Sequence, residues 1–144
     1  DRARSVMFRT DYLFALGRAT YNFAYLEWAI ISLANKLERG FLEEAPNLTA
    51  GKIAARFTET CEALPKLHPK RESCIELAIL FRQLVEDRNR LVHGNPYSTE
   101  SGEQRLRYFG RHGIKEWSVI QIGEFSDRCA LAAIEASRLL HRQD

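Results

Sequence analysis

The sequence predicts an all-α fold: an up-and-down bundle of four main helices, with a short hairpin-like insert between the third and fourth helices. Four segments place apolar residues at intervals of three and four, which is the spacing of a helix face that packs on a core. Glycine, proline or a capping hydroxyl residue bounds several of these segments. A chain of 144 residues suits one core, so we expect a single domain over residues 1–144.

The longest predicted helix covers residues 10–38 and carries two apolar stripes. The first stripe has the steps of a packed bundle helix and comprises Tyr12, Leu16, Ala19, Phe23, Leu26, Ile30, Leu33 and Leu37. The second lies on nearly the opposite side and comprises Phe14, Tyr21, Tyr25 and Trp28. A helix that is apolar on two faces is either central or shared with another subunit. In a bundle of four helices none is surrounded by the others, so the second stripe predicts a homodimer interface.

The other predicted helices cover residues 50–64, 70–94 and 124–142. Thr49 is expected to cap the first of them, and Gly94 is expected to end the second as a left-handed cap. Between the last two helices, residues 95–104 are polar and rich in turn formers, which predicts a loop. Two β-like runs follow, at 106–109 and 117–122, and we expect a marginal hairpin because an isolated strand pair is weak.

Composition narrows the class of protein. A net charge of +2 means that any affinity for nucleic acid comes from local patches. The three cysteines are far apart in the sequence, which fits neither a disulfide framework nor a zinc site, so we expect buried thiols, no metal, no cofactor and a cytoplasmic location. The most apolar run, residues 23–34, is too short to span a membrane. The basic residues 1–9 are expected to form a solvated tail, with an RNA-contacting arm as the alternative.

The last turns of the helix over residues 70–94 hold the candidate catalytic residues Arg88, Asn89 and His93. Arg88 falls near the centre of the apolar arc, where a helix that only builds a core would carry another leucine. Asn89 and His93 are four residues apart and share a neighbouring strip. A guanidinium among apolar residues, beside an imidazole, is the least ordinary feature of the chain. We therefore place the function here.

These residue types suit RNA cleavage without a metal. That reaction needs a base for the ribose 2′-hydroxyl, an acid for the leaving 5′-oxygen and positive charge near the phosphorane. Imidazole can act as acid or base near neutral pH, and arginine can hold a phosphate by two hydrogen bonds. The structural alternative is that His93 caps the helix and that Arg88 balances a buried carboxylate such as Glu27.

The run Arg88-Asn89-Arg90-Leu91-Val92-His93, followed by Gly94, resembles the motif of the HEPN superfamily of small helical-bundle domains. The resemblance implies a metal-independent endoribonuclease whose two protomers share one cleft, often in toxin–antitoxin or phage-defence systems with a protein antitoxin as partner. One branch of that family has a tyrosine two positions after the histidine, where this chain has Asn95. Some members are inactive, so a non-catalytic helical module that binds a protein or RNA is the alternative function.

The insert supplies candidate RNA-binding residues: Arg105, Arg107, Arg111 and Tyr108. Cations interleaved with aromatic rings suit phosphate contact and base stacking. The alternative is a charged loop whose aromatic side chains fold back on the bundle.

Overall fold

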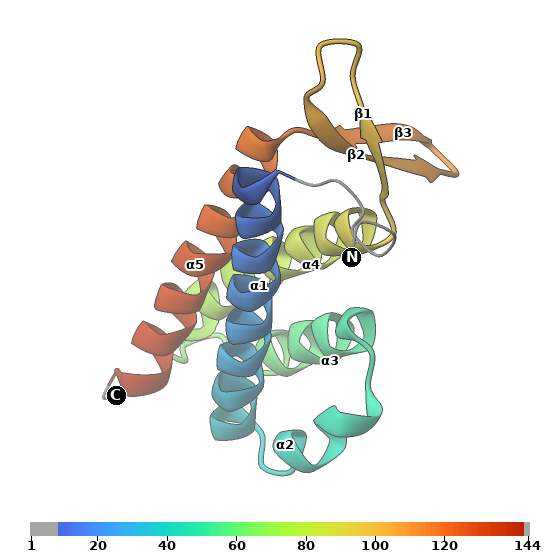
Figure 1. The fold of residues 1–144 in the computed structure, drawn as a ribbon. Helices are drawn as coiled ribbons and strands as arrows, with labels where there is room; N and C mark the ends of the chain where they lie inside the picture. The colour runs from blue at the N-terminus through green and yellow to red at the C-terminus, as the bar shows by residue number, and fades with distance from the viewer. Residues whose placement is uncertain (1–8, 143–144) are drawn as a thin grey trace.

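The computed structural model describes residues 9–142, so the basic N-terminal stretch lies outside the described part except for Arg9. Five α-helices and a three-stranded antiparallel sheet make up this part of the chain (Figure 1). The helices are α1 (Thr10–Leu37), α2 (Phe41–Glu44), α3 (Ala50–Glu62), α4 (Arg71–Val92) and α5 (Val119–His141), with a 3-10 turn at Ala45–Asn47 after α2. The strands are β1 (Asn95–Ser98), β2 (Gln104–Gly110) and β3 (Gly113–Trp117).

The prediction of an all-α, four-helix bundle was wrong, because the insert is a complete small sheet. β2 is the central strand, and both of its neighbours pair with it in antiparallel register, with Pro96 opposite Leu106 and Leu106 opposite Trp117. The stretch predicted as a polar loop therefore begins with a strand, β1. A third strand supplies the support that an isolated hairpin lacks.

The sheet is anchored to the helices by two buried side chains. Leu106 and Trp117 are paired across β2 and β3, and both are almost fully buried. The Trp117 ring packs edge-on against Phe125 of α5, with 5.9 Å between ring centroids. An edge-to-face aromatic pair of this kind contributes about 0.5–1.5 kcal/mol beyond the burial of its area.

The second predicted β run, residues 117–122, is mostly the start of α5. Ser118 accepts a hydrogen bond from the Gln121 amide, and the Gln121 side chain accepts one from the Ser118 amide. This capping box satisfies two amides that would otherwise lack partners at the helix start. The run is rich in β-branched residues, but the cap and the packing of Ile122 in the core favour a helix.

The long helix was predicted correctly, and its first apolar stripe forms the centre of the core. Most residues of that stripe are buried, with Leu16 and Leu37 half-buried at its edge. Phe23 stacks with Phe81 of α4 and Phe125 of α5, so three helices meet at this ring. All three cysteines are buried, as expected.

The helices are not arranged up and down throughout. Hydrogen bonds join Arg18 to Asp127, Asn22 to Ser126 and Lys36 to the Leu140 carbonyl. Arg18 and Asn22 near the start of α1 contact Asp127 and Ser126, and Lys36 near its end contacts Leu140, so α1 and α5 run in the same direction. In Figure 1 they lie side by side, while α3 and α4 lie across α1.

Candidate functional site

The end of α4 brings the motif next to the sheet. The Gly94 amide donates to the Leu91 carbonyl at 3.2 Å, and β1 begins at the next residue. Gly94 does not have the left-handed backbone that was predicted, since its φ is not positive. A Cβ at this position would lie 3.2 Å from the Leu106 Cβ and 3.2 Å from the Leu91 carbonyl oxygen. Glycine therefore suits the close approach of β2 to the last helical turn rather than a left-handed turn.

Arg88 is half-buried at the junction of α1 and α4, as the apolar arc predicted. Its guanidinium carbon lies 5.1 Å from the centroid of the Phe23 ring, which is a cation–π distance. One guanidinium nitrogen donates a 3.0 Å hydrogen bond to the Asn89 side-chain oxygen. Asn89 therefore draws the charged head of Arg88 toward its own side of the helix.

A cavity of about 140 Å³ surrounds the Arg88 side chain, and its walls come from α1, α4 and α5. Phe23, Phe125 and Val92 make it largely apolar, and Glu27 is the carboxylate among its lining residues. Burial raises the pKa of Glu27, and the positive charge of Arg88 opposes that rise. The two groups are therefore electrostatically coupled inside a site that still opens to solvent.

Asn89 and His93 are exposed. His93 is the C-cap of α4, and its amide donates to the Asn89 carbonyl at 3.1 Å. Within residues 9–142 its imidazole makes no hydrogen bond or ion pair. The structure thus joins Arg88 to Asn89 directly and leaves the imidazole of His93 one turn away, accessible to a ligand.

The three predicted RNA-binding arginines differ in their ion pairs and in their exposure. Arg105 forms an ion pair with Glu103 at 3.0 Å, and Arg107 forms one with Glu116 at 3.1 Å. The Arg107 guanidinium also stacks on Tyr97 at 4.1 Å. Arg111 is exposed in the turn between β2 and β3. The charges of Arg105 and Arg107 are partly balanced within the sheet, whereas that of Arg111 faces solvent.

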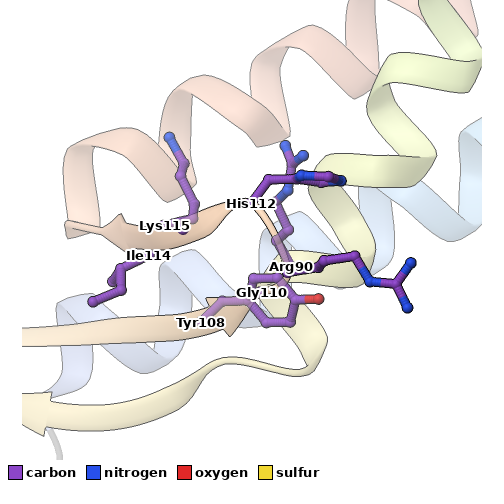
Figure 2. A pocket seen from close by; sticks show the side chains of 8 residues that line it. Arg90, Tyr108, Gly110, His112, Ile114 and Lys115 are labelled. Carbon is purple, nitrogen blue, oxygen red and sulfur yellow. The ribbon is translucent and has the colours of Figure 1, made fainter.

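Sequence reasoning missed a larger cavity beside this turn, of about 290 Å³, which includes Arg90, Tyr108, His112 and Lys115 in its lining (Figure 2). The register that pairs Tyr108 with Lys115 and Gly110 with Gly113 brings these residues together. The alternation of side chains between the two faces of β2 and β3 could have predicted which residues line this cavity. Using it required the bounds of β3, which the sequence pattern did not predict.

Within residues 9–142 no cluster of three or more histidine, cysteine, aspartate or glutamate side chains could hold a metal ion. None of the helices in the same range has the length and apolarity that crossing a membrane requires.

No protein-family model, curated protein or solved structure matches the chain. Its function is therefore inferred from its own residues.

Proposed function

We propose that the chain is a metal-independent endoribonuclease of the HEPN type. The observation that supports this best is the placement of Arg88. Its guanidinium is half-buried on the Phe23 ring and turned by Asn89, one turn before an exposed His93. A positioned cation and an accessible imidazole supply two of the three groups that phosphodiester cleavage by the ribose hydroxyl requires.

Each residue has a distinct role in this proposal. Arg88 binds the scissile phosphate and stabilises the charge that develops on its oxygens. His93 transfers a proton, either from the 2′-hydroxyl or to the leaving 5′-oxygen. Asn89 orients the guanidinium, since it already accepts a hydrogen bond from it. The buried Phe23 ring packs against the guanidinium of Arg88 and restricts its position.

A homodimer would supply a second proton-transfer group, because each chain offers one His93. The second stripe of α1 is suited to a subunit contact: Phe14, Tyr21 and Trp28 are 70%, 69% and 58% exposed. The cavity around Arg88 is lined on the α1 side by Ala24, which lies between Tyr21 and Trp28 in the sequence. A second copy on this face would therefore border the Arg88 cavity. A toxin–antitoxin or phage-defence role and a protein antitoxin follow from the resemblance alone, whereas the proposed cytoplasmic location follows from the cysteine pattern.

A non-catalytic module that binds RNA or a protein is the second candidate function. The contacts of Arg88 with Phe23 and Asn89, and its coupling to Glu27, favour it because they give this arginine a structural role. In that case His93 would be a ligand contact or a helix cap.

Cleavage of single-stranded RNA by purified protein, with a chelator present, separates the two candidates. General acid–base catalysis contributes about 10²–10⁴-fold per group, so His93→Ala should lower cleavage at least about a hundredfold. His141→Ala removes an exposed histidine near the end of α5 and should have no effect. Cleavage that survives in His93→Ala would overturn the proposal. RNA binding by the wild type without cleavage would favour the binding module.

A further inference from the structure

A second cavity lies between the β2–β3 turn and the end of α4, and it brings cationic and aromatic side chains together. It is lined by Arg90, Tyr108, Gly110, Arg111, His112, Gly113, Ile114 and Lys115. Figure 2 shows that these side chains come from three sources: the last part of α4, the two strands and the turn that joins them. Its volume of about 290 Å³ is at the lower end of the range for ligand cavities, so one small group fits better than a long segment.

The charge of this cavity is one-sided. Arg90, Arg111 and Lys115 bring three cations, His112 adds a titratable group, and no carboxylate is among the described residues that line it. Arg111 and His112 are exposed and make no hydrogen bond or ion pair with residues 9–142. Arg90 donates a 3.4 Å hydrogen bond to Asp87 and forms an ion pair with it, so its charge is partly balanced, whereas that of Arg111 is not. A hollow lined by one sign of charge concentrates the field, and this one attracts anions.

The backbone holds the cavity in a defined shape. A Cβ on Gly110 would lie 2.6 Å from the Tyr108 ring, so the ring packs directly on the glycine backbone. Gly113 has φ +123°, a conformation that other residues rarely adopt. Lys115 is held with its ammonium 4.7 Å from the Trp117 ring centroid. The two glycines and the Tyr108 ring thus shape the turn, and the Trp117 ring positions one of the three cations, Lys115.

We propose that this cavity binds a phosphate of single-stranded RNA, with the Tyr108 ring contacting the adjacent base. Cations beside an aromatic ring match the two repeating parts of a nucleic-acid strand, its phosphates and its bases. Arg90 is three residues before His93, so the cavity borders the motif on the last turn of α4. The inference rests on the proposed function in naming RNA as the ligand, and it assigns the cavity to substrate binding rather than to chemistry.

Binding is measured by fluorescence anisotropy with a labelled 2′-O-methyl RNA, which cannot be cleaved because its 2′-oxygens are blocked. The test variant is Arg111→Ala with Lys115→Gln, and the matched control is Arg39→Ala with Lys52→Gln, two exposed cations outside the cavity. Each phosphate contact to a single strand adds about 0.7 to the salt slope, which at about 0.15 M salt corresponds to roughly fourfold in affinity. Because the cavity takes one phosphate, the test variant should bind roughly fourfold more weakly with a slope lower by about 0.7, and the control should match the wild type.

Circular dichroism shows whether the test variant is folded, and Arg111→Glu, a change at one exposed side chain, gives a second reading that does not touch the Trp117 contact. Unchanged affinity and slope in both variants would overturn the inference. So would a wild type that binds anionic phosphatidylserine vesicles, through the exposed Ile114 for example, but not RNA. If the variants weaken RNA binding as expected while the wild type cleaves no RNA, the cavity stands as an RNA site and only the nuclease proposal fails.

Discussion

Replacing Arg88 by Met should lower the free energy of unfolding by about 1–2 kcal/mol near neutral pH. The guanidinium loses its contact with Phe23 at 5.1 Å, worth about 0.5–1 kcal/mol at a partly exposed site. It also loses the hydrogen bond to Asn89, worth about 0.5–1 kcal/mol because the acceptor is exposed. Methionine keeps most of the apolar stem, so no large cavity is left.

The cost should depend on Glu27, whose pKa is raised by burial and lowered by Arg88. Without Arg88 the pKa of Glu27 rises further above its ordinary value of 4.5. A carboxyl with a raised pKa in the folded state binds protons more tightly there than in the unfolded chain. Stability from this group is therefore fully present below about pH 4.5 and is lost as the pH rises through the folded-state pKa. The Arg88→Met penalty should accordingly be larger at about pH 7 than at about pH 4.

Urea unfolding of four proteins measures this coupling: the wild type, Arg88→Met, Glu27→Gln and the double variant. Residues coupled through a shared cavity typically show interaction energies of about 0.5–3 kcal/mol. Arg88 and Glu27 line one cavity but form no ion pair with each other, which places this pair near the lower limit. Arg88→Met should therefore cost about 0.5 kcal/mol less in the Glu27→Gln background than in the wild type. An identical cost in both backgrounds and at both pH values would refute the electrostatic coupling of Arg88 to Glu27.

Trp28→Glu should convert the proposed homodimer to a monomer in light scattering at micromolar concentration, and a wild type that is monomeric throughout would remove the shared cleft. Hydrogen bonds from Arg56 and Thr60 lower the pKa of Glu38, so its stabilising effect is present above pH 4.5 and is lost as the pH falls through the folded-state pKa. Thr60→Val should raise that pKa in a carbon-13 NMR titration, and no change would contradict the assignment. Trp117→Ala should cost about 3–5 kcal/mol in chemical unfolding and speed amide exchange in the sheet, whereas a cost under about 1 kcal/mol would show that the sheet is anchored elsewhere.

Regular periodicity made the helical part of the fold predictable. The stripe from Tyr12 to Leu33 correctly predicted the buried face of α1. The Thr49 hydroxyl accepts a hydrogen bond from the Lys52 amide, as expected of a helix cap. The sheet was harder to predict because β1 contains Pro96 and polar residues, which suit an edge strand but also a loop. Its pairing partners come from β2, after an intervening turn, and no local pattern reports that contact.

The parallel arrangement of α1 and α5 could not be predicted for a related reason. The direction of α5 depends on how the sheet returns the chain to Val119, and that path depends on β1 and β3 lying on opposite sides of β2.

The partial burial of Arg88 was predictable, but its contacts were not. Periodicity placed Arg88 on the buried arc of α4. Its contact with Asn89 depends on side-chain rotamers, since adjacent residues on a helix do not face one another. The cavity at Lys115 depends on strand register, and a shift by one residue would move the side chain to the other face of the sheet.

The chemistry of the products tests the central proposal most directly. A single-stranded RNA is digested in the presence of a chelator, the cleavage position is mapped, and the same strand with one 2′-deoxynucleotide on the 5′ side of that position is digested alongside it. If the ribose hydroxyl attacks under control of Arg88 and His93, mass spectrometry should find 2′,3′-cyclic phosphate ends from the first strand and no cut at the modified position. Cleavage at the deoxynucleotide, or products with 5′-phosphate ends, would contradict the mechanism.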